Sequence, residues 1–254
     1  MIFKRIIISA FIFFIFITKI SADQIPDFTI MTEDWKPYQY EEDGQLKGIA
    51  VDLLVLIFKE LGSLQGRDDI QMVPWARGYY TAQTIENTIL FSTTRTPERE
   101  NLFKWVGPIF QETTYLIGKK SRNIEIVQAD QLLEYTIGTI YDDVGEIYLS
   151  RLGFPREKMQ RTNHAENNVK MLSLDRIDLI VTGWTAFVHD AEHAGVDPDL
   201  YEPVYVADTS DLDFAFHIST PDSIVLKFQE AFDRIKKRGD LDALFTLYGE
   251  FIEN

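Results

Sequence analysis

The chain of 254 residues contains no cysteine. A disulfide framework, a cysteine-ligated zinc or iron–sulfur site and a thiol nucleophile are therefore all excluded. Cations are also scarce, with 25 Lys and Arg against 40 Asp and Glu and a formal net charge of −15. Because a nucleic-acid binder needs a basic surface to neutralise phosphates, we expect no nucleic-acid partner. Hydrophobic residues make up 45% of the chain, which is enough to build a core and argues against intrinsic disorder.

The N-terminal segment differs chemically from the rest of the chain. Lys4 and Arg5 precede an uncharged run, 6–18, and Ala22 then offers a small residue at a cleavage position. This order predicts a secretory signal peptide over residues 1–22. A membrane anchor is the alternative, but the run is shorter than the roughly 20 apolar residues that span a bilayer. A lipoprotein would need a cysteine after the cleavage site, so we expect a soluble protein of the periplasm.

Strand-like and helix-like patterns alternate along the remaining chain. Short β-rich runs occur at 28–32, 88–93, 136–141 and 178–182. The apolar spacing after Gly48 predicts a helix that ends at Gly62, and a second helix is predicted from an N-cap at Thr220 to a stop at Gly239. A short helix over 241–248 closes the chain. The alternation predicts an α/β fold.

The end of the second β-rich run carries the densest group of candidate binding residues. In an extended strand, Ser92 and Thr94 project from the same face. Thr96, followed by proline, is a good helix N-cap, and together with Arg99 it predicts a cradle for a carboxylate. The alternative is that Thr96 only caps a helix while Arg99 pairs with a surface acid. The spacing leaves both interpretations open.

Two aromatic groups follow strand-like runs. Trp35 and Tyr38 form the first, and Trp75 lies near Arg77 in the second. Aromatic side chains beyond a strand end favour stacking on a flat or apolar ligand. Ordinary packing in the core is the alternative and the commoner fate of such residues.

A pair of histidines is the only pattern that suggests a metal. His189 and His193 lie four apart in a helical stretch, which places both imidazoles on one face. The glutamate placement of a metalloprotease helix is missing and no third ligand is evident. The sequence therefore favours a solvated helix face, and we expect neither a metal nor a cofactor. It also contains no glycine-rich phosphate loop and no nucleophile elbow.

Several motifs follow one another in an order that carries more information than any one of them. They are WKPY at 35–38, DGQLKGIAVDL at 43–53, STTRTPER at 92–99 and RIDLIV at 176–181, followed by the C-terminal helix pair. Together they resemble the family 3 extracellular solute-binding proteins of bacteria, which are receptors for polar amino acids and related solutes. The resemblance covers essentially the whole chain after the signal peptide.

This resemblance implies a type II periplasmic binding fold, in which two α/β lobes enclose a cleft and two strands form the hinge. Lobe 1 would comprise residues 23–112 and 208–254, and lobe 2 residues 113–207. The hinge strands would cross near 110–116 and return near 204–213. Closure around a small-molecule solute would deliver it to an ABC permease in the inner membrane, and we expect the receptor to be a monomer.

The resemblance also assigns residues to the ligand. A ligand carboxylate would meet Arg99 and the hydroxyls of Ser92 and Thr94, and Trp35 would stack on the ligand. The complete set of candidate ligand-binding residues is Trp35, Tyr38, Trp75, Arg77, Ser92, Thr94, Arg99, Tyr141, Asp142, Asp143, Gly183 and Trp184.

Two departures from the family pattern concern the ligand's ammonium group. Family members usually carry an aspartate near the end of the second-lobe strand, where this chain has Gly183 followed by Trp184. The loop after Tyr141 usually contains a small Gly-Thr turn, where this chain has Asp142 and Asp143. Either one of these two aspartates has taken over the ammonium contact, or the ligand is not an α-amino acid.

Three classes of function fit these observations. The leading one is a non-enzymatic receptor for a carboxylate-bearing solute. The same scaffold resembles exported cyclohexadienyl dehydratases, in which case Asp142, Asp143 or another cleft carboxylate would act as the general acid. A sensor that presents a ligand-dependent surface to a membrane kinase or chemoreceptor is the third class.

Overall fold

The computed structural model describes residues 25–249, so the predicted signal peptide lies outside the described residues. The strands are β1 (Thr29–Thr32), β2 (Tyr40–Glu42), β3 (Gln45–Lys47), β4 (Ile70–Met72), β5 (Thr88–Thr94), β6 (Phe103–Lys119), β7 (Ile137–Ile140), β8 (Gln160–Thr162), β9 (Leu179–Gly183) and β10 (Tyr201–His217). The helices are α1 (Ile49–Glu60), α2 (Trp75–Thr84), α3 (Val144–Arg151), α4 (Ala165–Ser173), α5 (Trp184–Ala194), α6 (Asp222–Arg238) and α7 (Asp240–Leu247). The α/β alternation expected from the sequence is confirmed.

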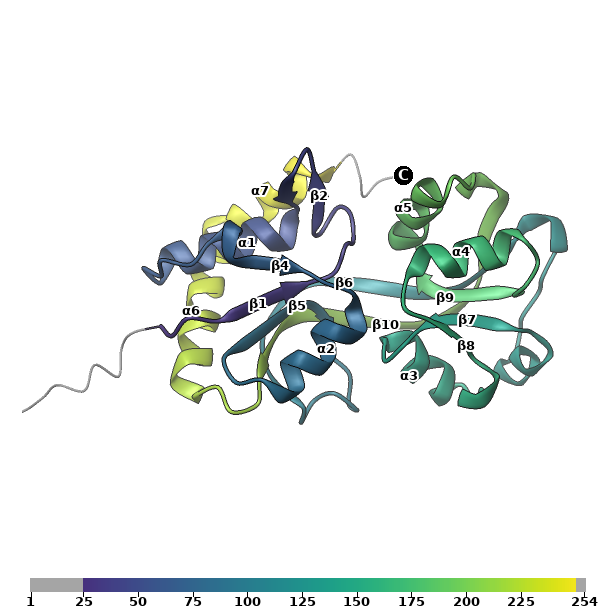
Figure 1. Cartoon of the computed structure of the whole chain (residues 1–254), viewed down its shortest axis with the longest axis horizontal. Helices are drawn as coiled ribbons and strands as arrows, with labels where there is room; N and C mark the ends of the chain where they lie inside the picture. Colours follow the sequence, from purple (N-terminus) through teal and green to yellow (C-terminus); the bar gives the residue numbers. More distant parts are fainter. Residues whose placement is uncertain (1–24, 250–254) are drawn as a thin grey trace, which may run out of the picture.

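Two long strands join two bodies that lie side by side (Figure 1). The main sheet has the order β4-β1-β5-β10-β6-β9-β7-β8, and β2 pairs only with β3. Strands β6 and β10 are 17 residues long each and pair antiparallel along their length. We call the body with β1 to β5, α1, α2, α6 and α7 the first lobe, and the body with β7 to β9 and α3 to α5 the second lobe. The predicted hinge crossings at 110–116 and 204–213 fall within β6 and β10.

Each of the two bodies has its own hydrophobic core. In the first lobe, α1 buries one face against β1, β5 and α6, with Leu54 and Phe232 among the fully buried side chains. In the second lobe, Leu116, Ile137 and Leu149 form part of one core, and α4 and α5 pack over another. The lobe boundaries at residues 112 and 207 stay a prediction.

Helix α1 starts where the backbone requires a glycine. Gly48 has a φ of 123°, and a Cβ at this position would collide with the Tyr38 carbonyl. The segment before α1 therefore packs directly onto the helix start, and this contact orders the loop that carries Trp35.

Two predicted helix starts are wrong. Residues 95–102 contain no helix beginning at Thr96, because 97–102 form successive turns. This segment has to return along the length of β5 before β6 begins, because both strands pair with β10. That return covers about 17 Å, calculated from the rise per residue of a strand. A helix over the same residues would advance only about 12 Å. At the other site, α6 begins one residue later than predicted, with Pro221 as its N-cap, and Thr220 Oγ1 is buried without a hydrogen-bond partner among residues 25–249. Its predicted stop at Gly239, in the left-handed region, is confirmed.

Within residues 25–249, no helix has both the length and the apolar character needed to cross a membrane.

Candidate functional site

A cavity lies between the two lobes and contains about 760 Å³ of empty space, part of it continuous with solvent. We call it the interlobe cavity. This size is typical of sites for small ligands. Its polar lining residues are Glu33, Asp34, Ser92, Thr94, Glu112, Thr114, Asp143, Thr182 and Asp190. Its aromatic lining residues are Trp35, Trp75 and Tyr148. A second, outer cavity of about 750 Å³ shares Glu33, Asp34, Trp75 and Asp190 with it.

Half of the candidate residues from the sequence come together at this cavity. They are Trp35, Trp75, Ser92, Thr94, Asp143 and Gly183. The loop after β1, the start of α2 and the end of β5 supply the first four, and the loop after β7 and the end of β9 supply the others. Strand ends from both lobes therefore meet at one place, although the binding role of each residue stays a prediction.

Other candidate side chains lie away from the cavity. Arg77 is exposed on α2, because two residues after the buried Trp75 a helix has turned by roughly 200°. Trp184 stacks on Phe187 at a ring-centroid distance of 5.4 Å within α5. Tyr141 is exposed, and its ring lies under the Arg161 guanidinium at 4.1 Å. None of these three lines the interlobe cavity.

Of the two neighbouring aspartates, only Asp143 lines the cavity. The Asp142 carboxylate instead lies 3.4 Å from Arg156 and 3.5 Å from Arg161. Its backbone carbonyl has a different role, because it accepts a hydrogen bond from Trp75 Nε1 at 3.1 Å. This bond joins the first lobe to the second.

Arg99 is buried, with 1% of its surface exposed, and does not itself line the interlobe cavity. Its guanidinium donates to the carbonyl of Thr94 at 3.2 Å and across the lobes to the carbonyl of Asp142 at 3.0 Å. Nε has no hydrogen-bond partner among residues 25–249. The rings of Trp75 and Tyr79 lie 5.2 and 4.8 Å from the guanidinium. The alternative of an Arg99 paired with a surface acid is therefore wrong.

The hydroxyl of Ser92 is fixed by a partner that the sequence did not indicate. Ser92 has a φ of 56°, a conformation uncommon for a residue other than glycine, and its hydroxyl donates to Gln39 Oε1 at 2.6 Å. Gln39 is fully buried. The strained strand end and the amide together set the direction of this hydroxyl.

Four carboxyl groups of the cavity wall, those of Glu33, Glu112, Asp143 and Asp190, have raised pKa values. Burial raises the pKa of Glu33 well above its usual range, and the charges of Asp143 and Asp190 add to this while Arg99 opposes it. Burial likewise raises the pKa of Asp143, against Arg99. It raises the pKa of Asp190 to about 7 and that of Glu112 to about 7. The solvent and the buried Arg99 guanidinium therefore cannot stabilise all of these carboxyl groups in their charged form.

The sequence profile of the bacterial extracellular solute-binding proteins, family 3, matches residues 29–251. The chain belongs to this family.

Known proteins resemble this family 3 chain over most of its length. A probable amino-acid-binding protein of Bacillus subtilis (strain 168), YxeM, is 23% identical over 223 residues, which cover 84% of this chain and 79% of that protein. An ancestral arginine-binding protein bound to arginine matches 86% of this chain and 96% of its own, with 17% identity and a TM-score of 0.73. An ABC uptake transporter substrate-binding protein from Streptococcus pneumoniae with bound histidine matches 87% and 91%, with 18% identity and a TM-score of 0.74. These structures confirm the predicted type II periplasmic binding fold.

Glu112 explains the glycine that departs from the family 3 pattern. A Cβ at Gly183 would collide with Glu112 Oε1. The carboxylate of Glu112 thus reaches the space into which a side chain at the end of β9 would point. Tyr38 stacks on Phe110 at 3.8 Å and is hydrogen-bonded to Glu112. A carboxylate from the hinge strand β6 therefore stands where this chain lacks the aspartate of the second-lobe strand.

Several lining residues of this family 3 site were missed from the sequence. Glu33 and Asp34 follow β1 directly, and the carboxyl end of a strand in an α/β sheet is a place where ligands bind. That position was the signal that could have found them. Glu112 and Asp190 lie inside a long strand and a helix, where no local pattern marks them.

Proposed function

We propose that the protein is a periplasmic receptor that binds a cationic amino acid in the interlobe cavity and delivers it to an ABC permease. The observation that carries this proposal is the charge of the cavity wall. Five carboxylates line it, those of Glu33, Asp34, Glu112, Asp143 and Asp190, and no Lys, Arg or His among residues 25–249 lines it beside them. A solute with more than one cationic group would neutralise this charge.

The carboxylate end of the solute would meet Arg99. Its unpartnered Nε and the lining hydroxyls of Ser92 and Thr94 support this orientation. A guanidinium recognises a carboxylate through paired donors, and its charge strengthens each hydrogen bond. The solute would replace part of the contact that Arg99 makes with the Asp142 carbonyl.

The ammonium end would meet Glu112, with Asp143 on the opposite wall. One α-ammonium group needs only one such carboxylate, so the remaining acids favour a solute with a second cation on its side chain. The similar structures with bound arginine and histidine support this solute class. Trp35 and Trp75 would cover the faces of a guanidinium or shield the alkyl chain of a lysine.

Delivery depends on a closed form that a permease can recognise. Contacts that join the lobes, from Trp75 and Arg99 to the Asp142 carbonyl, support a closed receptor. Membership of an extracellular solute-binding family supports the periplasm as its location. We propose that it acts as a monomer and as a receptor, not as an enzyme.

A thermal-shift screen of the chain without residues 1–22 tests this proposal. Basic, neutral and acidic amino acids are compared at equal concentration, and a ligand at a hundredfold excess over its dissociation constant stabilises the fold by about 2.7 kcal/mol. We expect arginine, lysine or ornithine to raise the melting temperature most. Stabilisation by acidic amino acids alone would overturn the solute class.

The assignment of Arg99 is tested by calorimetry on Arg99→Ala. Leaving a solute carboxylate buried and unpaired costs about 3–5 kcal/mol, so affinity should fall more than about a hundredfold. Arg99→Lys keeps the positive charge but lacks the planar guanidinium with its paired N–H donors, so this variant should also bind the solute more weakly. Arg95→Ala is the matched control, because Arg95 pairs with Glu100 on the surface. Retained affinity in a folded Arg99→Ala variant contradicts the assignment.

A further inference from the structure

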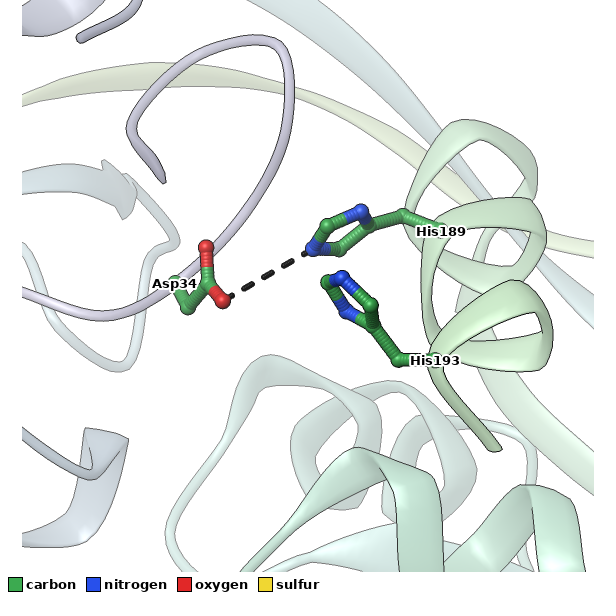
Figure 2. Close-up of side chains that lie close together, drawn as sticks. All are labelled: Asp34, His189 and His193. Atoms are coloured by element: carbon green, nitrogen blue, oxygen red, sulfur yellow. Dashed lines mark ion pairs between the residues drawn. The ribbon is translucent and has the colours of Figure 1, made fainter. Parts of the chain in front are cut away.

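Three potential metal ligands converge between the two lobes (Figure 2). His189 and His193 project from the same face of α5, and Asp34 approaches them from the loop after β1. One ligand atom from each residue lies within 4.8 Å of the others. The sequence showed only the two histidines, and the expected solvated helix face is wrong for His189, which is buried with 9% of its surface exposed.

The buried histidine has an unsatisfied ring nitrogen. His189 Nε2 has no hydrogen-bond partner among the described residues. A carboxylate oxygen of Asp34 lies 3.7 Å from this nitrogen, which is too far for a hydrogen bond. Leaving a buried polar atom without a partner costs free energy. The nitrogen and the Asp34 carboxylate face each other across a gap that an ion of suitable size could fill (Figure 2).

We propose that Asp34, His189 and His193 bind a divalent transition-metal ion such as Zn²⁺. Imidazole nitrogens with one carboxylate suit Zn²⁺, Ni²⁺ or Cu²⁺ better than Mg²⁺ or Ca²⁺, which prefer oxygen ligands alone. Bonds of about 2.0–2.1 Å in a tetrahedral site place ligand atoms about 3.3 Å apart. The Asp34–His189 pair is already close to that separation, and His193 reaches it by a small side-chain movement. Three protein ligands leave a fourth position for water.

Acidic residues lie around the three ligands, and the outer cavity connects the proposed site to solvent. Asp34 and His193 are exposed and line the outer cavity, where Glu33, Glu166 and Asp190 add negative charge. A cavity wall of one sign concentrates ions of the opposite sign.

The ion would link the lobes. Asp34 belongs to the first lobe, whereas both histidines belong to the second. Because the three ligands meet only when the lobes are close, the metal binds the closed form more tightly and shifts the population toward it. The site shares Asp34 with the wall of the interlobe cavity but uses neither Arg99 nor Glu112, and it can be tested without any solute.

The test is a calorimetric titration of tag-free protein with ZnCl₂ in the absence of amino acids. We expect one ion per chain, and binding at least about tenfold weaker in His193→Ala and in Asp34→Asn. Both positions are exposed, so the variants should fold with unchanged melting temperature. His164→Ala is the matched control, because His164 is exposed on the same outer cavity but lies outside the cluster. It should bind zinc as the wild type does.

Small-angle scattering of the same samples tests the link between the lobes. Zinc should reduce the radius of gyration of the solute-free wild type and leave that of His193→Ala unchanged. Failure of the wild type to bind zinc, or equal binding by the wild type and His193→Ala, overturns the site. Zinc binding with an unchanged radius of gyration overturns the bridge between the lobes.

Discussion

At the scale of single residues, Glu112 is a half-buried carboxyl in the wall of the interlobe cavity. It lies on the hinge strand, and its pKa is raised to about 7 by burial, while the hydrogen bond from Tyr38 favours its charged form. Gly183 leaves the space that its carboxylate needs. A carboxyl poised in this way is partly protonated near neutral pH in the absence of a cation.

Solute binding should therefore release protons. A cationic solute favours ionised Glu112, so its affinity should rise as the pH increases from about 6 to about 8. Calorimetry in two buffers with different ionisation enthalpies measures the released protons. Glu112→Gln should weaken binding and reduce both the release and the pH dependence. Glu125→Gln, at an exposed position, serves as the control. An unchanged pH dependence in Glu112→Gln would contradict the role of this residue.

Asp213 gives a prediction on stability alone. It is 2% exposed on β10, Oδ2 has no hydrogen-bond partner among residues 25–249, and burial raises its pKa to about 7 against the opposing charge of Arg95. The folded protein therefore binds this proton more tightly than the unfolded chain does. This contribution to stability is complete below about pH 4 and is lost as the pH rises to about 7.

Asp213→Asn should remove that loss. We expect the variant to melt at a higher temperature than the wild type above pH 7, with the difference shrinking as the pH falls toward 4. Thermal denaturation as a function of pH measures it, with the exposed Asp68→Asn as the control. Parallel profiles for the wild type and Asp213→Asn would show that Asp213 does not titrate as described.

At the scale of elements, one ion pair joins the turn after β5 to α3. Arg151 binds Glu98 through its Nε at 2.9 Å, and both side chains are about half-exposed. Such pairs contribute roughly 0.2–1 kcal/mol. Because Glu98 and Arg151 come from different lobes, the pair stabilises the closed form only.

Glu98→Gln should accordingly weaken solute affinity by less than about fivefold. Glu100→Gln is a close control, because Glu100 pairs with Arg95 within the first lobe. Calorimetry on both variants measures the difference. Equal effects of the two substitutions would show that the Glu98 pair does not contribute to closure.

Local sequence patterns predicted most of these elements but not their longer connections. Helix α1 after Gly48 and the stop of α6 at Gly239 depend on neighbouring residues, and both were predicted. The helix expected after Thr96 failed because the distance between the ends of β5 and β6 is set by their pairing with β10. The burial of His189 likewise depends on the second-lobe packing around α5.

At the scale of the whole molecule, the site exists only because distant segments meet. Trp35 and Ser92, which line the cavity, were predicted as candidates because they lie in motifs whose order resembles a family. Glu33, Glu112 and Asp190 come from a loop, the hinge strand and a helix, and only the arrangement of the two lobes brings them to one cavity. No periodic pattern in the sequence predicts that these three residues lie close together. Acidic residues in the cavity wall were therefore expected only at Asp142 and Asp143.

The central claim is that this acidic cavity selects a cationic amino acid. Calorimetric titration of the chain without residues 1–22 with L-arginine and L-citrulline tests it most directly, because the two solutes have nearly the same shape and differ in charge. A hydrogen bond to a charged group contributes about 1.5–3 kcal/mol. Arginine should therefore bind at least about tenfold more tightly than citrulline. Equal or tighter binding of citrulline would contradict the claim.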